Sequence, residues 1–179
     1  YQITKLIRYI YANGFAKTYN KVLSKFLLNK KYNFANNIWY NSSQIKQTNK
    51  KIVAVIGCGN FTFSNICYFL KNYQREFLHS TFDINIDKAI TTCKYYNGVL
   101  ATSDIKQILQ NKEIKLAYIA SNHSTHADYA VKLMKYGKHV HIEKPHVVSN
   151  KQLSLLMNEY AKKNSKIFLG FNRNQTKYT

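Results

Sequence analysis

One stretch, residues 51–62 (KIVAVIGCGNFT), constrains the fold more than any other part of the chain. Residues 52–56 are apolar without a break and mostly β-branched, which is typical of a strand buried on both faces of a parallel sheet. Gly57 and Gly59 follow at once, and from Phe63 onward apolar residues recur at helical spacing. A strand, a glycine turn and a helix N-terminus in this order predict the phosphate-binding turn of a dinucleotide-binding fold.

The glycine pattern departs from the complete fingerprint. The motif G-x-G-x-x-G requires a third glycine at the position of Thr62. Two glycines alone also fit an ordinary tight turn, so the interpretation depends on the rest of the chain. Thr62 either caps the helix or pushes the turn slightly outward, and the sequence leaves both alternatives open.

From residue 51 onward, strand patterns and helix patterns alternate. The expected strands are residues 52–56, 77–83, 98–101, 116–120, 139–142 and 166–170, and the expected helices are residues 60–73, 86–96, 103–110, 124–136 and 149–163. Ser103 and Ser149 are the expected N-caps of two of these helices. This alternation predicts an α/β fold with a doubly wound, six-stranded parallel Rossmann sheet over residues 51–173.

The first 50 residues have a different character. Two amphipathic helical patterns, separated at Asn13-Gly14, occupy residues 1–30, and residues 31–50 are interpreted as a linker. No acidic residue precedes Glu76, and the whole chain carries a net charge of +19. This basic helical extension could contact an anionic membrane surface or pack on a neighbouring domain or subunit. A general Lys, Asn and Ile bias is the alternative explanation of the charge, and no specific nucleic-acid partner is expected.

The cysteines and histidines narrow the chemistry. Three cysteines without a C-x-x-C motif predict reduced thiols and a cytoplasmic location, and no apolar run is long enough for a transmembrane helix. Cys58 could carry a thiol whose pKa is lowered by the helix N-terminus, or could simply be a small residue that fills the turn. Five histidines between residues 123 and 146 do not match a metal-binding frame, so no metal site is predicted.

Polar residues follow the expected strands at their carboxyl ends, where doubly wound sheets bind ligands. Asp83 ends the second strand, where a carboxylate can accept hydrogen bonds from the adenosine ribose hydroxyls. Its charge repels a 2′-phosphate, so NAD is predicted over NADP. Ser121, Asn122 and His126 follow the fourth strand and are expected on the nicotinamide side of the crevice.

The tripeptide Glu143-Lys144-Pro145 follows the fifth strand and contains the only proline of the chain. Proline restricts the preceding residue to extended geometry, which holds Lys144 at the strand tip. We hypothesise a cis bond before Pro145. A lysine exchanges protons near neutral pH when burial and a neighbouring positive charge favour its neutral form, and Lys144 is the candidate catalytic residue.

Several segments together resemble one protein family. They are IGCGNF (56–61), FDIN (82–85), YIASNHSTHADYA (118–130), YGKHVHIEKP (136–145) and LGFNR (169–173). In order and spacing they are similar to the Gfo/Idh/MocA oxidoreductases. The resemblance implies an N-terminal nicotinamide-cofactor domain followed by an α/β substrate domain. It also implies that Lys144 is the catalytic-site lysine, Glu143 the cofactor-side acid and Asp83 the ribose acid.

Two further departures accompany Thr62. Ser121-Asn122 replaces the more usual Thr-Pro, and the sequence ends at Thr179, where the substrate domain is expected to begin after a link that starts at residues 174–179. The predicted cofactor-binding residues are Gly57, Cys58, Gly59, Asn60, Phe61, Asp83, Ala120, Ser121, Asn122, His126, Glu143 and Lys144.

The predicted function is that of the NAD-binding domain of an oxidoreductase that acts on a sugar, nucleotide-sugar or polyol hydroxyl. The domain is expected to be catalytically incomplete alone and part of a homo-oligomer when intact. The alternatives are a non-catalytic dinucleotide-binding scaffold and a basic protein that binds a polyanion or a membrane surface.

Overall fold

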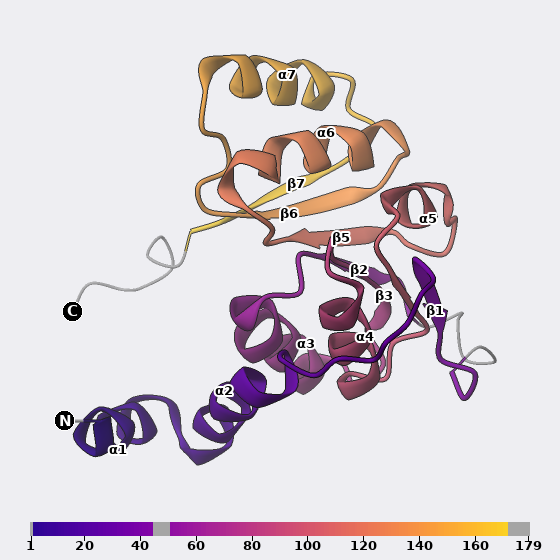
Figure 1. The fold of residues 1–179 in the computed structure, drawn as a ribbon. Coiled ribbons are helices and arrows are strands. Elements are labelled where there is room, and N and C mark those ends of the chain that lie inside the picture. Colours follow the sequence, from indigo (N-terminus) through magenta and orange to yellow (C-terminus); the bar gives the residue numbers. More distant parts are fainter. Residues whose placement is uncertain (1, 45–50, 172–179) are drawn as a thin grey trace, which may run out of the picture.

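In the computed structural model, which describes residues 2–44 and 51–171, seven strands form one sheet in the order β1-β4-β3-β2-β5-β6-β7 (Figure 1). All adjacent strands are parallel except the edge pair β1 and β4. The strands are β1 (Ile38–Tyr40), β2 (Val53–Ile56), β3 (Leu78–Phe82), β4 (Leu100–Thr102), β5 (Leu116–Ile119), β6 (His139–Glu143) and β7 (Ile167–Gly170).

Both faces of this sheet are covered by the helices α3 (Cys67–Tyr73), α4 (Ile86–Tyr95), α5 (Ile105–Gln110), α6 (His126–Lys135) and α7 (Asn150–Tyr160) (Figure 1). Two further helices, α1 (Gln2–Asn13) and α2 (Phe15–Leu27), form the N-terminal extension, and α1 lies beyond α2, away from the sheet (Figure 1). A π-helical turn (Thr62–Ile66) leads into α3, and a 3₁₀ turn (His123–Thr125) leads into α6. The predicted α/β, doubly wound fold is confirmed, and all six predicted strands are present.

Two apolar layers hold the helices against the sheet. On one face, side chains of α3 and α4 such as Cys67 and Ile90 pack against Val55 of β2. On the other face, Ile108 of α5, Leu133 of α6 and neighbouring residues pack against the central strands. Strand β2 lies in the middle of the sheet and is buried on both faces, as the sequence predicts. Side chains on both of its faces contact the core, and all of them are therefore apolar.

The prediction that residues 31–50 form a linker is wrong for residues 38–40, which form the antiparallel edge strand β1. Three residues, Ile-Trp-Tyr, are too short for a periodic signal, but each favours an extended backbone. Residues 45–50 and 172–179, including part of the predicted linker and the whole expected link at 174–179, lie outside the described residues.

The helix boundaries agree with the sequence patterns except at one cap. Ser149 caps α7 as predicted, because its side chain accepts a hydrogen bond from the backbone N–H of Gln152. The predicted cap Ser103 is wrong: Asp104 caps α5, and the Ser103 hydroxyl donates to the side chain of Asn37 instead. The Ser103 hydroxyl, which the sequence predicts to cap the helix, is therefore hydrogen-bonded to Asn37 in the segment before β1.

The N-terminal extension packs on the Rossmann sheet domain, beside α3 and α4 (Figure 1). The amide of Asn20 donates to the Tyr96 hydroxyl at 3.2 Å, and the backbone N–H of Tyr32 donates to Asp87 at 3.0 Å. The buried residues of α2 are polar, namely Thr18, Asn20 and Ser24, and the partly buried Leu27 at its end packs against the core of the domain. The extension was expected to contact a membrane surface or to pack on a neighbouring domain or subunit. The structure shows it packed on the Rossmann domain of the same chain.

Candidate cofactor-binding site

A crevice runs along the carboxyl ends of β2, β3, β5 and β6, at the point where strand order reverses between β2 and β5. Its wider part, the first cavity, has a volume of about 490 Å³ and lies between the loops that follow β2, β3 and β5. Its narrower part, the second cavity, has a volume of about 290 Å³ and reaches the end of β6. Ala120 and Ser121 line both cavities, so the two adjoin at the loop that follows β5.

Gly57 begins the turn at the floor of the crevice. Its φ angle is +92°, which L side chains rarely adopt, and a Cβ there would lie 2.7 Å from the carbonyl oxygen of Ala120. Gly59 is different, since an added Cβ would have no protein atom within 4 Å. Gly59 therefore faces open space in the first cavity, where a ligand phosphate can approach the backbone closely.

Thr62 stands where a third glycine was expected, and it holds the turn rather than opening it. Its hydroxyl donates a hydrogen bond to the carbonyl oxygen of Gly57 at 2.5 Å, and the residue is 1% exposed. The helix begins at Asn60 and passes through the π-helical turn before α3. A π-helical turn is wider than an α-helical one, which accommodates the threonine side chain beside the sheet.

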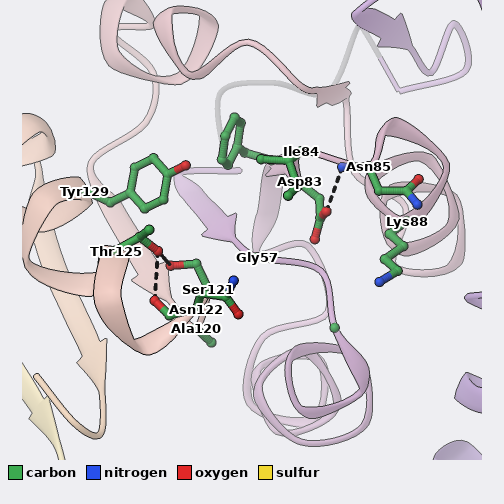
Figure 2. Close-up of a pocket in the computed structure, with 12 residues that line it drawn as sticks. Gly57, Asp83, Ile84, Asn85, Lys88, Ala120, Ser121, Asn122, Thr125 and Tyr129 are labelled. Atoms are coloured by element: carbon green, nitrogen blue, oxygen red, sulfur yellow. Dashed lines mark hydrogen bonds between the residues drawn. The ribbon is translucent and has the colours of Figure 1, made fainter. Parts of the chain in front are cut away.

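Asp83 lies at the edge of the first cavity and is fixed by two backbone groups. The N–H of Cys58 donates to one carboxylate oxygen at 2.7 Å, and the N–H of Asn85 donates to the other at 2.8 Å. Figure 2 shows Asp83, Asn85 and Lys88 on one side of the crevice and Thr125 and Tyr129 on the other. Each carboxylate oxygen retains a further acceptor position for a ligand hydroxyl.

Cys58 does not line the crevice. The side chain is fully buried, and its thiol points toward the carbonyl oxygen of Phe82 at 3.5 Å. Burial, and secondly the nearby Asp83 carboxylate, raises the pKa of the Cys58 thiol well above its ordinary value. Of the two interpretations, the small residue that fills the turn is supported. The lowered pKa is wrong, because burial opposes the thiolate.

The loop after β5 forms the opposite wall. The hydroxyls of Ser121 and Thr125 lie 2.8 Å apart, and the Thr125 hydroxyl also donates to the carbonyl oxygen of Asn122 (Figure 2). Ser121-Asn122 thereby forms the closed loop needed before α6 without the usual proline. Ser121 and Asn122 both line the first cavity, and Ser121 also lines the second.

His126 ties this loop to the end of β6. One ring nitrogen lies 2.8 Å from the carbonyl oxygen of Pro145, and the other lies 2.9 Å from that of Ser121. A carbonyl oxygen only accepts, so a neutral ring donates to one of the two and an imidazolium donates to both. His126 lines the second cavity but is 1% exposed, which makes it chiefly a residue that positions the two loops.

Glu143 and Lys144 line the second cavity, and the peptide bond between Lys144 and Pro145 is cis, as hypothesised. Glu143 packs against Gly170 of β7, where an added Cβ would lie 3.0 Å from its carboxylate. Burial raises the pKa of the Glu143 carboxyl above its ordinary value, partly opposed by a hydrogen bond from the Lys144 backbone. The Lys144 side chain is exposed, so the described residues do not provide the burial on which its predicted proton exchange depends.

The predicted site residues are thus largely brought together. Gly57, Gly59 and Asp83 line the first cavity, Phe61 and Lys144 line the second, and Asn60 lies at the edge near α2. Sequence reasoning missed six residues that line the first cavity: Phe82, Ile84, Asn85, Lys88, Thr125 and Tyr129. Ile84, Asn85 and Lys88 follow Asp83 within five residues. Their position just after the end of a strand could have predicted that they line the crevice.

The geometry fits a dinucleotide, because open backbone at Gly59, a fixed carboxylate at Asp83 and two adjoining cavities coincide. Among residues 2–44 and 51–171, no group of three or more His, Cys, Asp or Glu side chains is placed to hold a metal ion. None of the helices in the described part of the chain is long and apolar enough to cross a bilayer.

The family model described as an oxidoreductase family with an NAD-binding Rossmann fold matches residues 51–171. This chain belongs to the Gfo/Idh/MocA oxidoreductase family. Oxidoreductase P35 of Formosa agariphila is 27% identical over 121 residues, which are 68% of this chain and 38% of that protein. The family assignment establishes an NAD(P)-binding oxidoreductase domain.

Solved structures share the fold of this Gfo/Idh/MocA chain. The 3-ketoreductase KijD10 of Actinomadura kijaniata, in complex with TDP-benzene and NADP, has a TM-score of 0.62 at 20% identity; the match covers 69% of this chain and 39% of that one. An NAD-binding oxidoreductase from Klebsiella pneumoniae has a TM-score of 0.59 at 19% identity over 71% and 36% of the two chains. The chain therefore spans less than two fifths of the length of these relatives.

Proposed function

We propose that this chain binds NAD or NADP across the crevice and positions the nicotinamide for hydride exchange with a substrate hydroxyl carbon. The observation that most supports this proposal is that the two cavities adjoin at Ala120 and Ser121, with the glycine turn and Asp83 lining one and Glu143 and Lys144 lining the other. The pyrophosphate then lies over Gly59 and the helix N-terminus, and Asp83 accepts from the adenosine ribose.

In this arrangement the bound cofactor supplies or accepts the hydride at nicotinamide C4. Lys144, at the mouth of the second cavity, donates a hydrogen bond to the substrate hydroxyl or carbonyl oxygen and moves its proton. Because Lys144 is exposed here, its shielding from water is expected to come from the bound substrate. Residues 51–173 are the proposed cofactor domain, and alone it binds cofactor without appreciable turnover.

For the substrate we propose a sugar, nucleotide-sugar or polyol. The support is the ligand pair of KijD10, a 3-ketoreductase that binds TDP-benzene and NADP. Between the cofactors, the Asp83 carboxylate favours the free 2′-hydroxyl of NAD, whereas Lys88 on the same cavity wall attracts a 2′-phosphate. Selection between NAD and NADP therefore depends on the balance of charge around the ribose.

Cofactor addition is expected to stabilise the chain. At about 100 times Kd, a ligand that binds only the folded state adds about 2.7 kcal/mol. For a chain of this length the melting temperature rises by roughly 5–10 °C, which a thermal-shift titration with NADH and NADPH measures. Adenosine without phosphates is the control ligand and is expected to give a much smaller shift. The absence of a shift with both dinucleotides would refute the proposal.

Exposed apolar and aromatic side chains on the outer side of α2 favour a second role, which is peripheral contact with an anionic membrane. Phe15, Tyr19, Val22 and Phe26 follow one another at helical spacing and are all exposed, the two phenylalanines at 72%. No acidic residue lies before Glu76, so this stripe is set in a wholly basic surface. Aromatic side chains enter the headgroup region while neighbouring lysines attract anionic lipids, at about 1 kcal/mol per basic residue.

The membrane role predicts that vesicles containing phosphatidylserine sediment the protein and that phosphatidylcholine vesicles do not. Replacing Tyr19 and Phe26 by serine is expected to weaken this binding by about tenfold or more. Phe168→Ser, at an exposed aromatic residue of β7, is the matched control and should have little effect. If instead the double variant loses self-association in light scattering, the stripe is the interface of a homo-oligomer and the membrane role fails.

A further inference from the structure

A third cavity of about 340 Å³ lies between the N-terminal extension and the glycine turn. Lys25, Leu28 and Asn29 at the end of α2 form one wall, and Gly59, Asn60 and Lys88 form the other. Gly59 and Lys88 also line the first cavity, so the third cavity adjoins the first at residues that the second cavity, with Lys144, does not share. The three cavities therefore follow one another from the end of β6 to α2.

The wall made by α2 is held at defined points. The Ser24 hydroxyl donates to the side-chain oxygen of Asn60 at 3.2 Å, which joins α2 directly to the residue after the glycine turn. The Thr91 hydroxyl donates to the carbonyl oxygen of Leu27 at 3.4 Å, so the last turn of α2 is also tied to α4. Lys25 follows Ser24, and its place on the cavity wall is set by these contacts.

The third cavity is electropositive. Within residues 2–44 and 51–171, neither the Lys25 nor the Lys88 ammonium group makes a hydrogen bond or an ion pair with a protein group. The acids nearest in the chain are already engaged: Asp83 accepts from two backbone N–H groups, and Asp87 accepts from Tyr32 and pairs with Lys31 at 3.6 Å. Two like charges that face one cavity repel each other, and an anion between them removes that repulsion.

We propose that the third cavity is a phosphomonoester subsite for the 2′-phosphate of NADP, in which Lys25 of the extension acts together with Lys88. This inference rests on the proposed cofactor binding. A dinucleotide that spans the second and first cavities places its pyrophosphate in the first cavity, over the glycine turn, and its adenosine ribose beside Asp83. A phosphate on the 2′-hydroxyl then extends beyond the ribose, toward the side that Gly59 and Lys88 share with the third cavity.

The consequence is that the N-terminal extension is part of the cofactor site and shifts the preference toward NADP. The sequence-based expectation of NAD considered Asp83 alone. A phosphate between two ammonium groups gains charge-assisted hydrogen bonds that outweigh repulsion from a carboxylate already engaged by two N–H donors. NADP is thus the cofactor that this chain selects.

The test measures NADPH and NADH affinities of the full 179-residue chain by fluorescence titration, for wild type, Lys25→Gln and Lys88→Gln. Lys25→Gln is expected to weaken NADPH binding about tenfold, equivalent to about 1.4 kcal/mol, and to change NADH binding less than about twofold. Lys21→Gln is the matched control, since Lys21 lies one turn earlier on α2 with its ammonium group over the Tyr9 ring at 4.0 Å. It should leave both affinities within about twofold.

Two results overturn the inference while the proposed function stands. NADPH affinity that is unchanged in Lys25→Gln would remove Lys25 from the site. Equal losses for NADH and NADPH would show that the lysine acts on the pyrophosphate or on overall charge. If neither cofactor binds to wild type, cofactor binding itself fails, so the two failures are distinguishable. Thermal melts of each variant without ligand confirm that the substitutions leave the fold intact.

Discussion

Gly57→Ala is expected to abolish measurable dinucleotide binding and to lower the free energy of unfolding by about 3 kcal/mol. The residue has a φ angle of +92°, which by itself costs an alanine about 1–2 kcal/mol. The added Cβ would also lie 2.7 Å from three backbone atoms of Ala120 and Ser121. These backbone atoms directly follow the central strand β5 and cannot move aside easily, so the strand ends that form the crevice must separate.

Gly59→Ala provides the matched control because it adds the same methyl group two residues away. Its Cβ meets no protein atom within 4 Å, so the free energy of unfolding should stay within about 1 kcal/mol of wild type. The methyl group nevertheless enters the space through which a phosphate approaches the backbone, and we expect affinity to fall about tenfold.

Thermal melts and NADH titrations of both glycine variants separate folding from binding. The expected decrease in melting temperature for Gly57→Ala is about 6–12 °C, with almost none for Gly59→Ala. A Gly57→Ala protein that keeps both its melting temperature and its NADH affinity would show that the turn is not as tight as the structure describes. Unchanged affinity in Gly59→Ala would place the pyrophosphate elsewhere.

Asp83→Ala is expected to weaken NADH binding by about 100-fold. The estimate assumes two hydrogen bonds from ribose hydroxyls to a charged acceptor at about 1.5 kcal/mol each. NADPH affinity should fall less, because the substitution also removes a negative charge next to the 2′-phosphate. The ratio of the two affinities is therefore the informative quantity, and it should shift toward NADPH by about tenfold.

Asp83→Ala also removes the acceptor for the backbone N–H groups of Cys58 and Asn85, so part of its effect could come from a disturbed turn. Asp83→Asn addresses this, since its side chain has the same shape and keeps one acceptor oxygen. We expect it to retain most of the stability while losing NADH affinity about tenfold. Equal losses of NADH and NADPH in both variants would contradict the ribose role.

The sequence predicted local structure correctly where a short pattern of residues is compatible with only one backbone conformation. Four of the five apolar residues before Gly57 form the buried strand β2, and the proline after Lys144 restricts the end of β6. The family segments lay at these strand ends, so most predicted site residues line the crevice. Strand β1 was not predictable in this way, because three residues contain too little periodicity.

Side-chain roles were harder to predict because they depend on burial. Cys58 lies at a helix N-terminus, which favours a thiolate, yet it is fully buried beside a carboxylate and its pKa is raised. His126 was expected to face the ligand, but both its ring nitrogens lie close to backbone carbonyl oxygens of separate loops. Neither the raised pKa of Cys58 nor the two backbone contacts of His126 could be predicted from the neighbouring residues in the sequence.

By itself, the sequence determined the order of strands and helices, the glycine turn and the polar strand ends of this Gfo/Idh/MocA domain. Hydrophobic periodicity and turn chemistry act over a few residues, and right-handed crossovers then leave few ways to arrange the strands. Only the tertiary structure decided that α2 forms a wall beside the glycine turn. That contact joins Ser24 to Asn60 and Asn20 to Tyr96, and such pairs depend on how distant segments pack in space.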